Sequence, residues 1–93
     1  MTVLISMEFP ATADQYDQVN EALGEEPPDG LILHSATDMG GTMRIVDVWE
    51  SADKFAAFGE RLGPIVESVM GAGGASLQPD IQELHNLEVH QTA

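Results

Sequence analysis

Two apolar segments joined by a short glycine-containing link constrain the fold of this chain more than any other feature. The segments cover residues 31–36 and 42–50, and the link between them contains Asp38-Met39-Gly40-Gly41. Two consecutive glycines adopt positive φ angles at little energetic cost, as a tight turn requires. A link this short joins antiparallel strands, because parallel strands need a crossover of a dozen residues or more. We therefore predict an antiparallel hairpin within the fold.

A strand and a helix are predicted ahead of this hairpin. Residues 2–9 form a run rich in Val, Leu, Ile and Met, which is typical of a buried strand. Thr12 followed by Gln15 is the pattern of a capping box, in which the hydroxyl accepts a hydrogen bond from a free N–H group of the first helical turn. Gly24 suits the position just after a helix, so the helix is expected over residues 13–23. Its apolar positions are Tyr16, Val19 and Leu23.

A second helix and a fourth strand are predicted after the hairpin. Ser51 is a favourable N-cap for the helix. The apolar positions of this helix are Phe55, Phe58, Leu62, Ile65, Val66 and Val69. Pro64 lacks an N–H group and its ring clashes with the carbonyl group four residues earlier, so a kink or break is expected near residues 62–63. The glycine-rich residues 71–74 are expected to end the helix, and residues 81–89 to form the last strand.

The order strand–helix–strand–strand–helix–strand indicates the fold class. It is the order of the α+β ferredoxin-like fold (βαββαβ), which has one four-stranded antiparallel sheet. A chain of 93 residues cannot support a second core, so residues 1–93 are expected to form a single domain. Two helices cover one face of such a sheet, and Val46 and Val48 are assigned to the bare face. Because an apolar sheet face seldom stays exposed to water, we predict a homodimer in which two such faces pack together.

The charge of the chain limits its partners and location. Sixteen Asp or Glu residues against three Lys or Arg residues give a net charge of −13, which repels nucleic acids and anionic membranes. The same charge predicts self-repulsion at low ionic strength and greater stability as salt screens it. No apolar run is long enough to span a bilayer, and the start lacks the basic region of a signal peptide, so a cytoplasmic location is expected. The absence of Cys excludes disulfides and thiolate metal sites.

Five segments that are spread over most of the chain carry a family likeness. They are Gly30-Leu31-Ile32-Leu33-His34, residues 41–51 with their final Val48-Trp49-Glu50-Ser51, Phe55-Ala56-Ala57-Phe58, Leu62-Gly63-Pro64 and Leu84-His85-Asn86. Together they resemble the antibiotic-biosynthesis-monooxygenase-like branch of the dimeric α+β barrel superfamily. The resemblance implies a homodimer whose sheets pack face to face, with a pocket between helices and sheet in each subunit. Relatives oxidise aromatic polyketides without metal or flavin, cyclise polyketides or degrade haem.

The resemblance also bears on cofactors. Haem-degrading relatives use an Asn on the first strand, a Trp at the end of the third strand and a His on the second helix. Trp49 matches the Trp, whereas residues 3–9 contain no Asn, and Phe58 and Gly59 stand where the His would be. Without an axial ligand on that helix, haem chemistry is not expected, and we predict a protein that works without a cofactor.

Strand alternation groups the candidate residues by face, because successive side chains of a strand point to opposite sides. The groups are Met43, Ile45, Asp47 and Trp49; Ile32, His34 and Ala36; and Ile81, Glu83, His85 and Leu87. The resemblance implies that Trp49 faces the pocket, so Asp47 is expected to face it too. For the strands that carry His34 and His85, alternation leaves open which face lines the pocket.

His34, Asp47 and His85 are the candidate catalytic residues. A carboxylate in an apolar strand is costly unless it is paired, and the available partners of Asp47 are His34, His85 and Arg61. A His–Asp pair orients the imidazole ring and raises its basicity, as proton removal from a phenol or a β-dicarbonyl compound requires. The alternatives are a pair that only fixes strand register, histidines bonded to backbone carbonyls, and a metal site of two His and one Asp. The spacing of these residues does not support the last alternative, so no metal is predicted.

The candidate substrate-binding residues are large and mostly apolar. They are Met7, Tyr16, Met43, Trp49, Phe55, Phe58 and Leu62. Such side chains give a cavity soft apolar walls, and Trp49 could stack against a flat ligand. The alternative is that they simply fill the core, as the position of Tyr16 on one helical face with Val19 and Leu23 suggests.

Three functions fit these features. The first is a small cofactor-free enzyme in which His34, with Asp47 or His85, removes a proton from an aromatic or polyketide-like molecule, so that the carbanion meets oxygen or closes a ring. The second is a dimer of the same fold that binds a small apolar ligand without catalysis. The third is a structural dimer whose pocket is filled by its own side chains.

Overall fold

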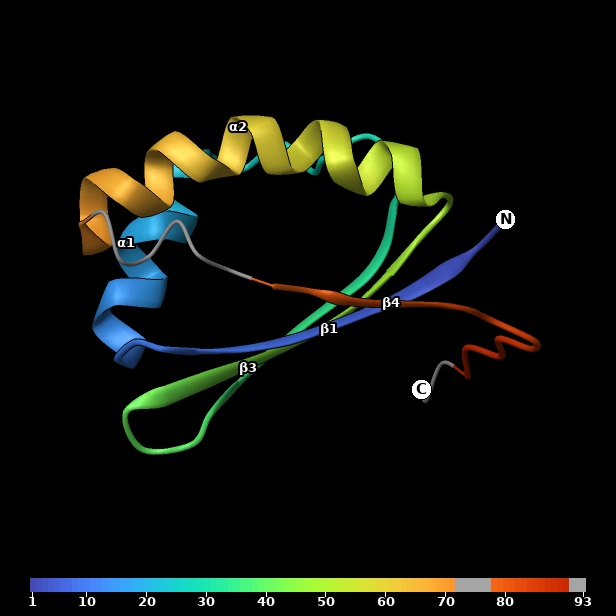
Figure 1. Cartoon of the computed structure of the whole chain (residues 1–93), viewed down its shortest axis with the longest axis horizontal. Coiled ribbons are helices and arrows are strands. Elements are labelled where there is room, and N and C mark those ends of the chain that lie inside the picture. The colour runs from blue at the N-terminus through green and yellow to red at the C-terminus, as the bar shows by residue number, and fades with distance from the viewer. Residues whose placement is uncertain (72–77, 91–93) are drawn as a thin grey trace.

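The computed structural model describes residues 1–71 and 78–90 and contains the expected elements in the expected order (Figure 1). They are β1 (Val3–Pro10), α1 (Ala13–Leu23), β2 (Leu31–Asp38), β3 (Thr42–Trp49), α2 (Ala52–Met70) and β4 (Asp80–Glu83). The predicted βαββαβ order is therefore confirmed, and α1 has the predicted ends.

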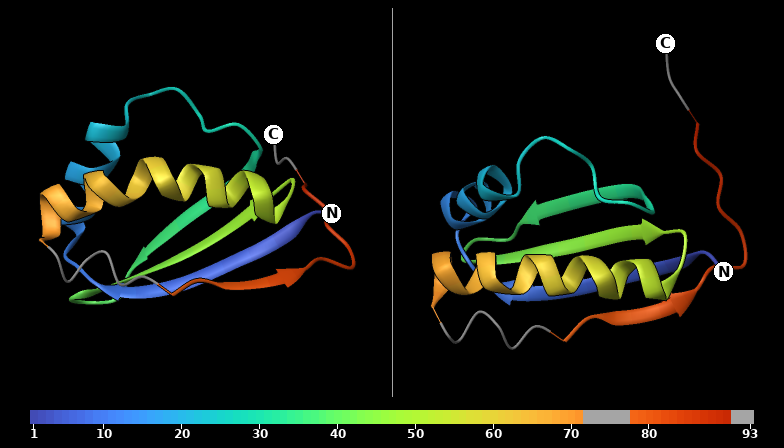
Figure 2. Two further views of the ribbon diagram at one scale, coloured as in Figure 1. Left: turned by 45° about the horizontal axis from the view of Figure 1, so that its top comes forward. Right: turned by 90° about the horizontal axis from the view of Figure 1, so that it is seen from above.

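The strands form one antiparallel sheet in the order β2-β3-β1-β4, and both helices lie on the same face of it (Figure 2). β2 and β3 pair as the predicted hairpin. At its turn Gly40 and Gly41 have φ angles of 80° and 95°. Glycine adopts this region without steric cost, which explains why the short link can reverse the chain here.

The helix ends follow from local sequence, and of the kink or break predicted in α2 the break is absent. The Thr12–Gln15 capping box is present, and the Ser51 side chain accepts a hydrogen bond from the Lys54 N–H group. The break expected near residues 62–63 does not occur, since α2 continues through Pro64 to Met70. Pro64 lies on the exposed side of the helix, where water can satisfy the carbonyl group that the proline ring leaves unpaired. Neither helix of the described chain is long and apolar enough to cross a membrane.

The fourth strand is shorter than predicted. The expected strand covers residues 81–89, whereas β4 ends at Glu83. Glu83 is opposite Val3, the first residue of β1, and the hydrogen bond from Leu84 N to Thr2 O is 3.0 Å long. β4 therefore ends where its partner strand begins. Of the predicted glycine-rich stop, Gly71 caps α2, and residues 72–74 lie outside the described residues.

The two faces of the sheet differ. The central cluster of the core lies between the sheet and α2 and consists of Val3, Ile5, Trp49 and Phe55. On the helix-free face, Leu4 and Val46 are half-buried and Leu33 is exposed. Val48 on the same face has only 3 % exposure, because Leu4 and Leu33 are its neighbours on the adjacent strands. The expectation that Val48 meets water in a single chain is therefore wrong, although the face as a whole remains partly exposed.

Candidate functional site

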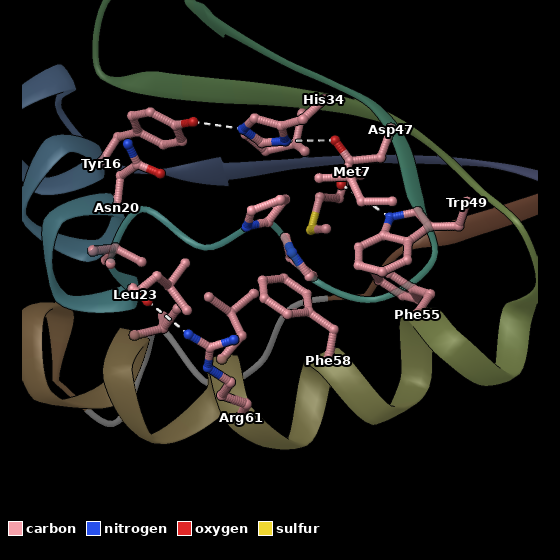
Figure 3. A pocket seen from close by; sticks show the side chains of 18 of the residues that line it. Met7, Tyr16, Asn20, Leu23, His34, Asp47, Trp49, Phe55, Phe58 and Arg61 are labelled. Carbon is pink, nitrogen blue, oxygen red and sulfur yellow. Dashed lines mark hydrogen bonds and ion pairs between the residues drawn. The ribbon is translucent and has the colours of Figure 1, made fainter.

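A cavity of about 250 Å³ lies between the two helices and the helix-covered face of the sheet (Figure 3). Its lining includes eight of the ten predicted site residues: Met7, Tyr16, His34, Asp47, Trp49, Phe55, Phe58 and Leu62. The two others do not line it. Met43 is buried in the core at the far end of β3, and His85 lies exposed beyond the end of β4. His85 is no longer on a strand, so the predicted face that it shares with Ile81 does not exist.

Strand register brings His34 and Asp47 together. They are direct cross-strand partners of β2 and β3, and His34 Nδ1 lies 2.6 Å from Asp47 Oδ1. An ionised carboxylate can only accept, so the Nδ1–H group of His34 donates this hydrogen bond. Of the three partners considered for Asp47, the structure thus selects His34. Arg61 instead donates from its guanidinium group to the Leu23 carbonyl oxygen at 2.6 Å.

The pair extends into a longer series of hydrogen bonds. The Tyr16 hydroxyl, on α1, lies 2.5 Å from His34 Nε2, and the Trp49 indole N–H group donates to Asp47 Oδ2 at 3.2 Å. Both carboxylate oxygens of Asp47 are therefore hydrogen-bonded, which offsets the cost of burying a side chain that is 6 % exposed. In a neutral His34, Nε2 has no hydrogen, so it accepts from the Tyr16 O–H group. The order Tyr16–His34–Asp47 is visible along the upper part of Figure 3.

The surroundings shift the proton affinity of both titrating groups. The hydrogen bond from His34 to Asp47, together with the negative charge of Asp47, raises the pKa of His34 against the opposing effect of burial. Burial, with the nearby charges of Asp47 and Asp17, raises the pKa of Tyr16. Tyr16 is therefore a neutral phenol near pH 7, and His34 is a stronger base than an isolated imidazole.

The indole ring of Trp49 packs within the apolar wall of the cavity and does not expose a ring face for a ligand to stack on. Its ring packs against Phe55 edge to face, with centroids 5.6 Å apart, and against Phe58 at 5.3 Å. Trp49 has no exposed surface. Its burial therefore supports the core-packing alternative in this conformation, with Phe55 and Phe58 held in place by the indole ring.

Several lining residues are not among the predicted site residues, and Leu31 and Arg61 are the most informative of them. β2 has an irregular register between Leu31 and Leu33, so that Leu31 is opposite Trp49 and lines the cavity. This irregularity breaks the predicted alternation, in which Ile32 shares the face of His34. No pattern in residues 31–36 predicts it. Arg61 was considered only as a partner of Asp47, yet its side chain lines the cavity.

The described chain does not assemble a metal site. His34 and His85 are not brought together, so the alternative with two His ligands and Asp47 does not form within one chain. No group of three His, Cys, Asp or Glu side chains that could hold a metal ion occurs in residues 1–71 and 78–90.

Comparison with known proteins identifies the fold. No family model matches the chain, and no curated protein matches it. Among solved structures, a candidate antibiotic biosynthesis monooxygenase from Deinococcus radiodurans is similar over 99 % of this chain and 100 % of its own, at 14 % identity and a TM-score of 0.65. A monooxygenase of Streptomyces coelicolor, from the gene ActVA-Orf6 and in complex with nanaomycin D, is similar over 96 % of this chain and 92 % of its own (14 % identity, TM-score 0.61).

A third similar structure has a different ligand. A single-residue mutant of MhuD, with two manganese protoporphyrin IX molecules bound per active site, is similar over 98 % of this chain and 100 % of its own (14 % identity, TM-score 0.54). The chain therefore has the ferredoxin-like fold of antibiotic-biosynthesis-monooxygenase-like proteins over nearly its whole length. At these identities the likeness establishes the fold alone, because one fold can support many different reactions.

Proposed function

We propose that this protein is a cofactor-independent, monooxygenase-like enzyme that acts on an apolar aromatic or polyketide-like molecule bound between the helices and the sheet. The observation that carries the proposal is the hydrogen-bonded series Tyr16–His34–Asp47, which places acid–base groups on the wall of a mostly apolar cavity. A base of raised proton affinity beside apolar walls suits removal of a proton from a weakly acidic organic molecule.

The order of the three groups defines a path for the proton. His34 Nε2 is already bonded to the Tyr16 hydroxyl, so a substrate proton reaches His34 through that hydroxyl. The Tyr16 oxygen accepts the proton of the substrate while its own proton passes to Nε2. Asp47 stabilises the imidazolium that results and keeps Nδ1 protonated.

The deprotonated substrate supplies the electrons for oxidation, with dioxygen as the second substrate. A carbanion at a benzylic CH₂ group and dioxygen form a new C–O bond, and the proton held by His34 returns to the terminal oxygen of the peroxide. Loss of water then breaks the O–O bond and leaves a carbonyl group. In sum, CH₂ and O₂ give C=O and H₂O, so that carbon is oxidised and dioxygen is reduced.

The similar structures support the choice of ligand class. One is a monooxygenase that was solved with nanaomycin D, and another holds manganese protoporphyrin IX. Among the described residues, the pocket offers no axial ligand for a haem iron. Phe58 and Gly59 occupy the position on α2 where haem-degrading relatives have a His, and both ring nitrogens of His34 are already hydrogen-bonded. A flat aromatic molecule without a metal is therefore the better match to this pocket.

We also propose that the protein works as a homodimer through the helix-free face of the sheet. Leu4, Val46 and Leu33 remain partly exposed there in one chain. Pairing with the same face of a second copy would remove these apolar side chains from water. Sedimentation at micromolar concentration and moderate ionic strength is expected to show a particle of twice the chain mass of 10.0 kDa. A particle of the single-chain mass would contradict the proposed dimer.

The proposed activity can be tested with anthrone, a tricyclic ketone whose CH₂ group lies between two aryl rings. The protein is expected to accelerate oxygen uptake and anthraquinone formation above the rate without protein.

His34→Gln is expected to lower the rate about 100-fold, because the proton acceptor is lost. His90→Gln is the matched control, since His90 is exposed and lies outside the cavity. Binding of anthrone with no acceleration would contradict the enzyme and favour the non-catalytic ligand-binding dimer. Native mass spectrometry of the purified protein would identify a ligand that stays bound.

A further inference from the structure

We infer that Arg61 binds an anionic group of the ligand, so that the pocket selects an aromatic acid over its neutral counterpart. The inference rests on the proposed ligand pocket and narrows the class of molecule that fits it. It is carried by the charge pairing of the chain and by the position of Arg61.

Arg61 is the one Lys or Arg residue without a carboxylate partner in the described chain. The Lys54 Nζ atom lies 3.2 Å from Asp29 Oδ1 and 3.2 Å from Glu50 Oε2. The Arg44 Nη2 atom lies 3.6 Å from Glu8 Oε2. The chain has sixteen carboxylate side chains and only three Lys or Arg side chains. With carboxylates in such excess, a guanidinium group that pairs with none of them is available for an external anion.

The position of Arg61 directs this charge to the cavity. Its Nη2 group donates to the Leu23 carbonyl oxygen, at the end of α1, at 2.6 Å. This bond ties the side chain across the gap between α2 and α1, on the wall of the pocket (Figure 3). A guanidinium group has five N–H donors, so most of them remain for a ligand.

The two polar parts of the pocket lie on opposite sides of it. In Figure 3, the side chains of Tyr16, from α1, and His34, from β2, meet along the upper part of the view. Arg61 projects from α2 in the lower part, and the apolar side chain of Phe58 also comes from α2. A ligand that spans the cavity therefore places its acidic C–H or O–H group at Tyr16 and its anionic group at Arg61. Glu25 and Glu26 also line the cavity and follow closely after Leu23, so an anion binds there only through the charge and the remaining N–H donors of Arg61.

The test compares 2-naphthoate with 2-naphthamide, two probes of nearly equal shape that differ in charge. Binding is measured at pH 7 by NMR titration, with the indole N–H signal of Trp49, the single Trp of the chain, as the reporter in the cavity. The wild-type protein is expected to bind the acid about five- to tenfold more tightly than the amide, a modest preference because Arg61 is exposed. Arg61→Gln keeps a donor for the Leu23 carbonyl group and is expected to remove the preference while leaving the affinity for the amide unchanged.

Arg44→Gln is the matched control. This variant removes the same charge from the helix-free face of the sheet, opposite to the face that lines the cavity, and it is expected to keep the preference for the acid. Sedimentation of both variants checks that assembly is unchanged. Equal affinity of the wild-type protein for the two probes would overturn the role of Arg61 while leaving the pocket intact. An equal loss in both variants would overturn it as well, because only long-range charge would then act. Failure of both probes to shift the Trp49 signal would contradict the ligand pocket on which the inference rests.

Discussion

His34 and Asp47 lie opposite each other on adjacent antiparallel strands, with His34 Nδ1 2.6 Å from Asp47 Oδ1. The pairing depends on the register of the β2–β3 hairpin, because a slip by one residue would turn one of the two side chains to the other face of the sheet. The hairpin therefore positions the acid–base pair, and α1 adds Tyr16 from the other side.

Asp47→Asn is expected to lower the pKa of His34 toward its ordinary value of 6.5, because the charge that stabilises the imidazolium is removed. NMR titration of the His34 ring protons measures the pKa directly. Asp53→Asn, an exposed change in the first turn of α2, is the control and is expected to leave that pKa unchanged. An unchanged pKa of His34 in Asp47→Asn would show that the carboxylate does not control the imidazole.

The contribution of His34 to stability should depend on pH in a defined direction. Its pKa is raised in the folded state, so the protonated ring is stabilised by folding. This contribution is fully present below the unfolded-state pKa of about 6.5 and is lost as pH rises through the folded-state pKa. Urea unfolding of the wild type and of His34→Gln at several pH values measures it. The free-energy difference between them should be larger at pH 6 than at pH 9, and the reverse trend would contradict the sign of the shift.

Tyr16→Phe separates proton transfer from ligand binding. The change removes the hydroxyl that bonds to His34 Nε2 and keeps the ring that lines the cavity. Oxygen uptake with anthrone is expected to fall about 100-fold, while the free energy of unfolding falls by about 1 kcal/mol or less for the lost hydrogen bond. Affinity for the 2-naphthamide probe should stay within about twofold of the wild type, since an apolar wall is unchanged. Undiminished oxygen uptake in Tyr16→Phe would remove Tyr16 from the proton path.

Gly30→Ala is expected to destabilise the protein more than Gly41→Ala. Both glycines have positive φ angles, 92° and 95°, so both changes carry the same backbone strain of about 1 kcal/mol. A Cβ atom at Gly30 would lie 2.5 Å from Lys54 Cδ and 2.8 Å from Lys54 Cβ, whereas one at Gly41 meets nothing within 4 Å. We expect Gly30→Ala to cost about 1–2 kcal/mol more in urea unfolding. Equal costs would show that Lys54 moves aside freely.

Local features of the sequence predicted most of the fold. The Thr12–Gln15 capping box and Gly24 define α1, and the Gly40-Gly41 link defines the hairpin, because these signals act between residues close together in the chain. Alternation along residues 42–50 likewise put Asp47 and Trp49 on one face, as observed. The end of β4 was missed because it depends on where β1 begins, at a partner strand that lies at the other end of the sequence.

The sequence by itself determined the order of the elements and the excess of negative charge, and it marked Asp47 as a carboxylate in need of a partner. The sequence left His34, His85 and Arg61 as possible partners, and only the tertiary structure decided among them. Strand register places His34 against Asp47, β4 ends before His85, and Arg61 bonds to the Leu23 carbonyl group. It also joined Tyr16 to His34 and left Arg61 without a carboxylate in the part of the chain that the structure describes. The physical reason is that hydrogen bonds and ion pairs depend on distances between side chains from different elements, and packing of the helices on the sheet sets those distances.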